Sequence, residues 1–268
     1  MLVTGCWLCE TQLPEAANKL ENGMYTSNQH GKKKQIKYTM AMTDIFPSGV
    51  EVFTEQAEHN ENITIPAVIS KVDNQDNIFV FDRGVNKRDA FKDMDNHGIS
   101  FVTRVNQNCT FEIISSNELT VSNHKNLKIL SDQNVYLFKR KGGKSNPLRL
   151  IITRQIDKKK EKILILTNCD DLQIDEIIDI YKKRWDIEVF FRFIKQELNF
   201  SHFLSTNKNG IKIVLYITLI LAMLILVYKK LNNIGYKTAV RRFRIEMDEV
   251  IMKMTITFAG GDPSLVFR

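Results

Sequence analysis

The sequence contains few of the features that mark secreted, disulfide-stabilised or metal-stapled proteins. It has four cysteines in 268 residues, and only Cys6 and Cys9 form a close pair, in "CWLC". A zinc site of the usual kind would need a second close pair, whereas Cys109 and Cys169 stand alone. A redox dithiol normally opens a helix, but Pro14 and polar residues follow this one. We therefore expect reduced thiols without a functional role.

Internal repeats, low-complexity tracts and a secretory signal are also missing. The N-terminal stretch does not combine a charged start, an apolar centre and a small-residue cleavage site, so we expect a cytoplasmic protein. With 43% hydrophobic residues, a chain of this length can fill a real core and should be globular. Its 38 basic residues exceed its 31 acidic ones by seven, which fits a polyanionic partner such as nucleic acid or a lipid surface.

Only one hydrophobic run is long enough to raise the question of a membrane. Residues 213–228 carry no charge and lie between Lys212 and Lys229. The run is shorter than the roughly 20 residues that cross a bilayer, and it stands alone in the chain. A helix buried on all sides of a large domain has the same composition, and we prefer that interpretation.

What is present is an alternation of strands and helices. Residues 35–42 and 49–56 predict a β-hairpin, with Pro47 and Gly49 supplying the turn chemistry between them. Helix and strand then alternate, with helices expected at 61–72 and 86–98 and strands at 77–84 and 99–105. Pro66 lies near the start of the first of these helices. This order predicts an α/β fold.

The predicted secondary structure changes twice in the second half of the chain. Residues 107–168 contain short β-rich runs separated by polar loops: "FEII", "NVYLFKR", "RLIITRQ" and "KILILTN". Residues 169–268 are nearly all helical until Gly260, and Asp170 or Asp171 can cap the first helix. We therefore expect one domain over 1–268, with residues 1–106 as its first part, 107–168 as a β-rich insertion and 169–268 as its helical part.

Four polar side chains interrupt the apolar helix that follows the insertion. At about 100° per residue, Tyr181, Arg184, Glu188 and Lys195 lie within one stripe about 60° wide. A carboxylate can bind Mg²⁺, and Arg and Lys can hold phosphate oxygens, so the stripe suits a site for phosphate and a divalent metal. An exposed face with spaced ion pairs is the more common reason for such a pattern. The aromatic load of residues 185–193 leaves little of this helix free to face water.

A second acid, Asp82, follows the apolar run Ile78–Phe81. Open α/β sheets usually place ligand-binding and catalytic groups at the carboxyl ends of their strands. An Asp before Arg-Gly is also a common turn former, so Asp82 alone does not decide between the two roles.

The two stretches together resemble a known family. "VFDRG" and the spacing Y-x2-R-x3-E-x6-K are similar to the DDE transposases of bacterial insertion sequences that share this Tyr-Arg-Glu-Lys signature. The resemblance extends from about Lys32 to the C-terminal "GGDP". It implies an RNase H-like catalytic core with a β-rich insertion before the last catalytic helix, and a helical C-terminus. It also implies DNA partners, namely transposon ends and target, a homodimer in the DNA complex and no membrane.

The resemblance assigns a role to each signature residue. Asp82 corresponds to the second catalytic acid and Glu188 to the third, and both would be Mg²⁺ ligands. Tyr181, Arg184 and Lys195 correspond to the residues that contact transposon-end DNA and its phosphates. The implied chemistry is two-metal phosphoryl transfer, with hydrolysis of the donor strand and then attack of the freed 3′-hydroxyl on target DNA.

The chain departs from the family at the first acid. The family has an Asp in the first strand, but "MLVTGCWLCE" contains none; Glu10 follows its apolar run, and Asp44 is expected in a hairpin turn. We interpret the chain as starting just after the missing acid, as a truncated reading frame or decayed element, and its transposase activity as defective. Two alternatives are a non-catalytic DNA-binding fragment that inhibits transposition and a membrane-associated protein built around residues 213–228.

Overall fold

The computed structural model describes residues 2–10, 24–28, 31–44, 46–72, 77–119, 121–138, 144–157, 161–198, 205 and 207–267. For residues 2–10, 24–28, 31–35, 138 and 144–145 the description is confined to the backbone. The side chains of Cys6, Cys9 and Glu10 therefore lie outside it. Cys109 and Cys169 are free thiols, and burial raises the pKa of each.

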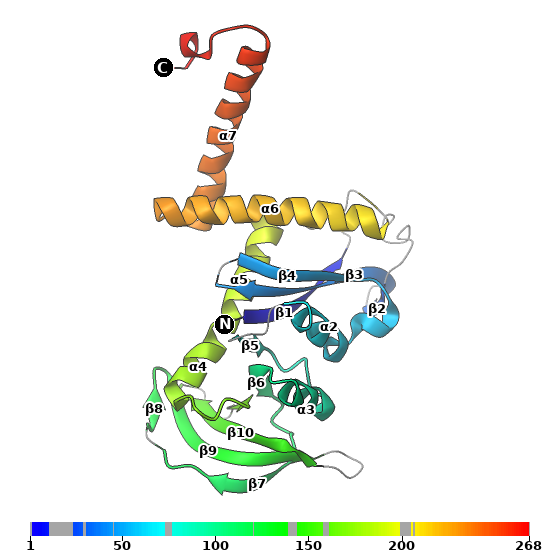
Figure 1. The fold of residues 1–268 in the computed structure, drawn as a ribbon, viewed down its shortest axis with the longest axis vertical. Coiled ribbons are helices and arrows are strands. Elements are labelled where there is room, and N and C mark those ends of the chain that lie inside the picture. Colours follow the sequence, from blue (N-terminus) through cyan, green and yellow to red (C-terminus); the bar gives the residue numbers. More distant parts are fainter. Residues whose placement is uncertain are drawn as a thin grey trace.

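Most of the strands predicted from the sequence belong to one sheet (Figure 1). The described part of the chain has an 11-stranded sheet in the order β2-β3-β1-β5-β6-β11-β10-β9-β7, with β4 beside β3 and β8 beside β9. The strands are β1 Leu2–Glu10, β2 Met24–Asn28, β3 Gly31–Thr43, β4 Phe46–Phe53, β5 Ile78–Phe81, β6 Ser100–Val105, β7 Phe111–Ser116, β8 Asn123–His124, β9 Leu127–Phe138, β10 Lys144–Gln155 and β11 Lys162–Thr167.

Three strands in the middle of the sheet run parallel to one another. β1 pairs with β5, and β5 pairs with β6, both in parallel register. All the other strand pairs described are antiparallel. β1 and β2 were not predicted as strands, although β1 lies between β3 and β5 in the sheet. Thr4 and Gly5 interrupt the apolar residues of β1, and they do not alternate regularly, so the strand signal was weak.

The hairpin of β3 and β4 is confirmed, but its turn was misplaced. Pro47 and Gly49 lie inside β4, paired with Met42 and Ala41 across a register shift. The turn contains Asp44, which has a positive φ of 55°. Proline is tolerated in β4 because, among the described strands, β4 pairs only with β3 and therefore lies at an edge of the sheet. A Cβ at Gly49 would come within 2.8 Å of the Val72 side chain, so a small residue is needed there.

The helices follow the predicted order with several corrections at their ends. They are α2 Glu61–Ile69, α3 Arg88–Asn96, α4 Ile174–Lys182, α5 Arg184–Glu197, α6 Lys208–Asn232 and α7 Tyr236–Phe258, with short 3-10 turns at Gln56–His59 and Pro263–Leu265. α4 begins after Gln173, whose side chain forms a capping box with Glu176, so the prediction of Asp170 or Asp171 as the cap is wrong. A break at Lys183 divides the predicted single helix into α4 and α5.

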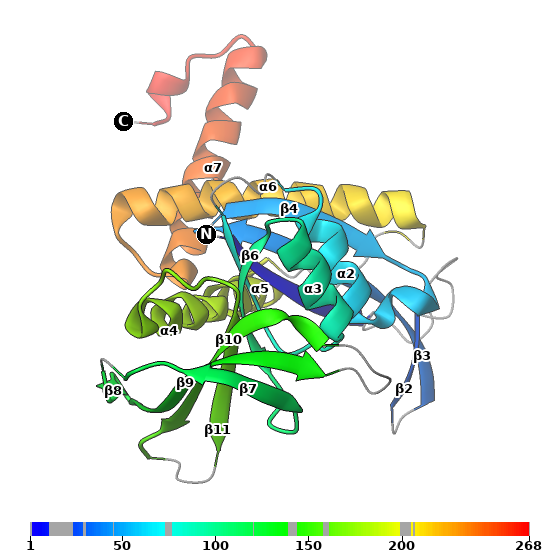
Figure 2. The same ribbon diagram turned by 60° about the horizontal axis from the view of Figure 1, so that its bottom comes forward.

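Helices cover both faces of the sheet. α2 and α3 pack on one face, where Phe79 and Phe81 of β5 are fully buried. α4 packs on the other face against β6 and β11, and α5 packs beside it against β3. Figure 2 shows β7, β9 and β10 continuing the sheet below this central part, so the β-rich insertion extends the same sheet. The mixed α/β architecture expected from the sequence is confirmed.

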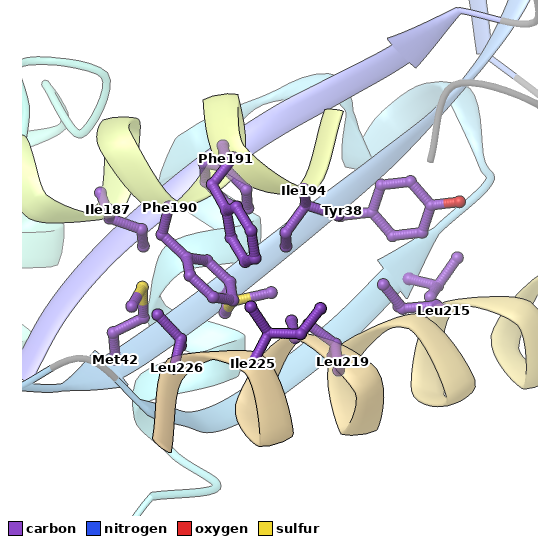
Figure 3. Packing of buried hydrophobic residues seen from close by; sticks show 14 of the residues in the cluster. Tyr38, Met42, Ile187, Phe190, Phe191, Ile194, Leu215, Leu219, Ile225 and Leu226 are labelled. Atoms are coloured by element: carbon purple, nitrogen blue, oxygen red, sulfur yellow. The ribbon is translucent and has the colours of Figure 1, made fainter. Parts of the chain in front are cut away.

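The apolar helix α6 is buried on one face, and the expectation of burial on all sides is wrong. Its buried side chains pack on α5 and β3, as Figure 3 shows for Leu215, Leu219, Ile225 and Leu226. Only 33% of its most apolar stretch is buried. α6 is long and apolar enough to cross a membrane, but a helix in the core of a protein can meet the same criterion.

Candidate active site

Asp82 lies where the three parallel strands end. It comes directly after β5, and Thr103 of β6 holds that end of β5 by donating a hydrogen bond of 3.0 Å to the Phe81 carbonyl. Parallel strands bring their carboxyl ends to one edge of a sheet, and this edge is the usual location of ligand sites in α/β folds. The Asp82 side chain is 44% exposed, so it is available to a ligand.

The two helices beside this edge are fixed by apolar packing. α4 buries Ile174, Ile177 and Ile178 against β6 and β11. α5 buries Phe190 and Ile194, among others, against β3 and α6. Burial of these faces sets the rotation of both helices, and it directs the polar stripe of the signature toward the end of β5.

Two of the four signature residues contact Asp82, and a third, Glu188, joins them through Arg184. The Tyr181 hydroxyl donates a hydrogen bond of 3.3 Å to Oδ1 of Asp82. Arg184 Nη1 lies 3.9 Å from Oδ2 of Asp82, and the same nitrogen donates to Oε1 of Glu188. Both carboxylates are therefore within ion-pair reach of one guanidinium nitrogen. Lys195 lies exposed about two turns further along α5 and is not part of this cluster.

Burial and neighbouring charges shift the pKa values of Tyr181 and Arg184. Burial, and then the negative charge of Asp82, raises the pKa of the Tyr181 phenol, which stays protonated as a donor at neutral pH. Burial opposes the charge of Arg184, but its hydrogen bond with Glu188 and the charge of Asp82 raise the pKa of the guanidinium overall. Its Nε is buried and has no hydrogen-bond partner among the residues that the structure describes. Arg184 therefore keeps one donor that the protein does not use.

Arg104, on the neighbouring strand β6, was not predicted as a site residue from the sequence. Thr103 pairs with Phe81, so Arg104 follows at the level of Asp82. Side chains alternate along a strand, and Val102, two residues earlier, packs on the α4 face. The positive charge of Arg104 accordingly acts to lower the pKa of Tyr181. The alternation in "FVTRV" could have predicted which face of the strand Arg104 is on. Only the order of the strands in the sheet shows that it lies next to Asp82.

The strand on the other side of Asp82 offers no aspartate. Leu2 pairs with Phe79 and Val3 with Val80, so continuing the register brings Gly5 level with Asp82. Glu10 is five residues further along β1, or roughly 16 Å at the usual rise of a strand. Asp44 follows Thr43, which pairs with Leu2 at the opposite end of β1. Neither acid is therefore level with Asp82 along β1.

The carboxylates of Asp82 and Glu188 could supply part of the coordination of one magnesium ion. Mg²⁺ is commonly held by one or two carboxylates, with substrate phosphates and water completing its coordination. Asp82 and Glu188 supply two such groups from two rigid elements. Among the described side chains, no group of three or more His, Cys, Asp or Glu could hold a metal. The pair of ions that the sequence resemblance implies would need one more acid.

Comparison with known proteins identifies the family. The transposase DDE domain matches residues 9–224. The chain belongs to this family. The match includes β5, the β-rich strands, α4 and α5, and hence the whole cluster around Asp82.

Bacterial relatives are named as transposases. Transposase y4zB of Sinorhizobium fredii is 30% identical over 135 residues, which are 50% of this chain and 37% of that protein. A transposase for insertion sequence element IS4SA of Synechocystis is 27% identical over 183 residues, 67% of this chain and 48% of that protein. A transposase for element IS5377 of Geobacillus stearothermophilus is 25% identical over 185 residues, 68% of this chain and 46% of that protein. The chain thus spans about half the length of the relatives it matches.

A solved structure shares the fold. The piggyBac transposase, in a synaptic complex with hairpin DNA, superposes with a TM-score of 0.55 at 11% identity. The superposition covers 95% of this chain and 53% of that one. At this identity the likeness concerns the fold alone.

Proposed function

We propose that this chain is the catalytic core of a DNA transposase of an insertion sequence, which cleaves DNA strands and transfers them to a target. The observation that carries the proposal is the meeting of Asp82 and Glu188 at Arg184, since these acids are 106 residues apart in the sequence. Family membership and the neighbouring transposases support the same reaction class.

The proposed core is RNase H-like. The parallel strands β1, β5 and β6, with the antiparallel strands β3 and β4 beyond β1, support this proposal. The strands β7 to β11 form the insertion before the last catalytic helix, α5. We propose that residues 1–268 form one domain of this kind.

The proposed roles follow from position. Asp82 and Glu188 would hold Mg²⁺, and Arg184, which now bridges them, would turn to phosphate oxygens once the metal neutralises the acids. Arg104 and Lys195 would hold DNA phosphates on either side, and Tyr181 would orient Asp82 through its hydrogen bond. When bound, the metal supplies a Lewis acid that activates water or a 3′-hydroxyl and stabilises the leaving oxygen.

The partners are proposed on the same basis. The site and the excess of seven basic residues suit transposon ends and target DNA. We propose a homodimer in the DNA complex, because two transposon ends are joined to one target. We also propose that the chain acts in the cytoplasm.

A second function is favoured by one observation. Gly5 is level with Asp82 when the register of β1 and β5 is continued, so this position lacks the carboxylate that would serve as the first catalytic acid of the family. Weak metal binding would leave DNA binding intact, and the chain would then act as a non-catalytic inhibitor of transposition. The Arg104, Arg184 and Lys195 side chains suit that role equally.

One set of variants separates the two functions. The full chain is incubated with Mg²⁺ and DNA carrying the repeats that flank its gene, and strand nicking is measured. We expect weak nicking that Glu188→Gln abolishes and that Glu197→Gln, on the same helix, leaves unchanged. Gly5→Asp should increase nicking by more than about tenfold, since even residues outside a metal's ligand shell are worth roughly 10–100-fold.

The outcomes are decisive for each function. Salt-sensitive DNA binding without nicking, in wild type and Gly5→Asp alike, would establish the inhibitor. Nicking that survives Glu188→Gln would contradict the assignment of this site. Absence of DNA binding would contradict both functions.

A further inference from the structure

The loop that follows Asp82 is held by the amino end of α2. This loop, residues 83–87, connects β5 to α3. Oδ1 of Asn62 accepts hydrogen bonds from the backbone N–H groups of Asn86, at 2.8 Å, and Lys87, at 2.7 Å. Nδ2 of Asn62 donates a further hydrogen bond of 3.2 Å to Oδ1 of Asn86. One side chain therefore fixes two consecutive peptide units where the loop enters α3.

Two more contacts hold the same loop nearer to Asp82. The Val85 side chain is fully buried in the core between the sheet and the helices α2 and α3. A Cβ on Gly84 would lie 1.3 Å from Oε2 of Glu61, so the Glu61 side chain lies directly against this glycine. Asp82 is thus followed by four consecutive residues, 84–87, that α2 or the core holds in place.

Asn62 is itself held by its own helix. Its Nδ2 also donates to Oδ1 of Asn60, the N-cap residue of α2, and the same oxygen accepts a hydrogen bond of 3.0 Å from the Asn62 N–H. Burial of Ile65, Val68 and Ile69 fixes α2 on the sheet. The side chain that grips the loop is therefore anchored to the hydrophobic core.

The direct contacts of the Asp82 carboxylate do not fix its position by themselves. The carboxylate is 44% exposed, and its contacts with Tyr181 and Arg184 are long, at 3.3 and 3.9 Å. A functional group keeps its geometry only when the residues that support it are held in place. The direction of this carboxylate therefore depends on the backbone on either side of it, and Asn62 holds the backbone that follows.

The supports of Asp82 come from the two faces of the sheet. α2 packs on one face and α4 on the other. Tyr181 of α4 contacts the carboxylate itself, whereas Asn62 of α2 contacts the loop behind it. An effect of Asn62 on Tyr181 would pass through the strand and loop between them, and these carry Asp82.

We propose that Asn62 is a positioning residue, which holds the loop after Asp82 and so keeps the Asp82 carboxylate directed toward Tyr181 and the metal site. Asn62 acts through the backbone of Asn86 and Lys87 and touches neither metal nor DNA. The use of the positioned carboxylate as a metal ligand rests on the proposed function, but the positioning does not.

A double-mutant cycle in the equilibrium constant of unfolding tests the positioning without metal or DNA. In the wild-type background, Tyr181→Phe should raise this constant about fivefold at neutral pH, the usual effect of losing one hydrogen bond. Asn62→Leu removes the hydrogen bonds of the side chain at nearly constant size. In that background Tyr181→Phe should raise the constant less than about twofold, because the Asp82 carboxylate is no longer held within reach of the phenol.

Two further variants separate positioning from a general loss of stability. Asn207→Leu removes a similar cap from α6, where Oδ1 of Asn207 accepts a hydrogen bond of 2.7 Å from the Gly210 N–H. It should destabilise the protein but leave the effect of Tyr181→Phe at about fivefold, because distant sites act additively. Asn62→Asp keeps the oxygen that accepts from the loop, so the full effect of Tyr181→Phe should return. Asn62→Ala takes the place of Asn62→Leu in the cycle if the leucine variant does not fold.

Binding of Mn²⁺, a paramagnetic substitute for Mg²⁺, connects the positioning to the proposed function. Electron paramagnetic resonance of the free ion gives the affinity. Asn62→Leu should weaken Mn²⁺ binding by about tenfold or more, as loss of a residue behind a metal ligand usually does, and Asn207→Leu should not change it.

The outcomes for the two proposals differ. Additive effects of Asn62→Leu and Tyr181→Phe, or equal Mn²⁺ affinity in wild type and Asn62→Leu, would overturn the role of Asn62. A wild-type chain that binds no Mn²⁺ would contradict the proposed function, and the cycle would still decide whether Asn62 positions Asp82.

Discussion

The Tyr181 hydroxyl donates a hydrogen bond to Oδ1 of Asp82 across 99 residues of sequence. This bond joins the end of α4 to the end of β5, and it exists only while the phenol keeps its proton. Removing the hydroxyl, or its proton, breaks this link between α4 and β5. The contribution of the bond to the free energy of unfolding, and the pH dependence of that contribution, can therefore be measured.

Tyr181→Phe should change the stability of the protein at alkaline pH. Burial and the charge of Asp82 raise the pKa of Tyr181 above its ordinary 10.0, so the folded state holds this proton more tightly than the unfolded state. The resulting stabilisation is complete below pH 10 and is lost as the pH rises through the folded pKa. Wild type should therefore lose stability above pH 10 more steeply than the variant.

Urea unfolding across this pH range measures the difference. At neutral pH the variant should be less stable by about 1 kcal/mol, the usual value of one hydrogen bond. Tyr216→Phe, at an exposed position of α6, is the control and should follow wild type. If the free energy of unfolding fell equally with pH in wild type and Tyr181→Phe above pH 10, the pKa of the Tyr181 phenol would not be raised in the folded state.

Arg184→Gln should make the protein depend on magnesium for stability. The guanidinium now lies between Asp82 and Glu188, and its loss leaves two nearby carboxylates without a counter-charge. We expect a lower Tm without metal and a larger rise in Tm on adding Mg²⁺ than in wild type, since binding to the folded state alone stabilises it. Thermal unfolding with and without Mg²⁺ measures both effects.

The same experiment has a matched control. Arg192→Gln removes the same group from an exposed position of α5, where it lies over the Trp185 ring. Its response to Mg²⁺ should equal that of wild type. If the added stabilisation of Arg184→Gln persists in combination with Glu188→Gln, the metal is not bound by this pair.

Replacement of Arg104 or Lys195 by Gln should weaken DNA binding and reduce its salt dependence. Each lost phosphate contact should make the slope of log K against log salt shallower by about 0.9. Lys92→Gln, exposed on α3 on the other face of the sheet, should leave the slope unchanged. Fluorescence anisotropy over a series of salt concentrations gives the slopes, and an unchanged slope for Arg104→Gln would remove it from the DNA surface.

Asp132→Asn should destabilise the protein strongly. Arg149 donates to both carboxylate oxygens of Asp132, at 2.7–3.2 Å, and its Nη1 donates 2.6 Å to the Leu172 carbonyl just before α4. Breaking a buried ion pair costs about 3–5 kcal/mol, because one charge is left without a partner.

Chemical denaturation at neutral pH measures this cost. The control is Glu249→Gln, which breaks an ion pair with Lys253 on the surface of α7. Exposed pairs contribute less than about 1 kcal/mol, so the control should change little. Equal losses in the two variants would mean that the Arg149 pair is not essential to the position of α4.

The sequence by itself determined the local helices and strands and the residues whose side chains could form a site. The uninterrupted apolar run Ile78–Phe81 predicted a buried strand, and the spacing from Tyr181 to Lys195 placed polar groups on one helical stripe. Such patterns depend on which face of an element avoids water, so they can be read within a few turns of chain.

Only the tertiary structure decided which elements meet. The register of β1 with β5 brings Gly5, rather than an acid, to the level of Asp82, and the pairing of β5 with β6 adds Arg104 to the site. Composition likewise showed that α6 is apolar, but not that one face of it remains uncovered. Strand pairing and helix packing join residues far apart in the chain, and their free energies depend on neighbours that no local pattern specifies.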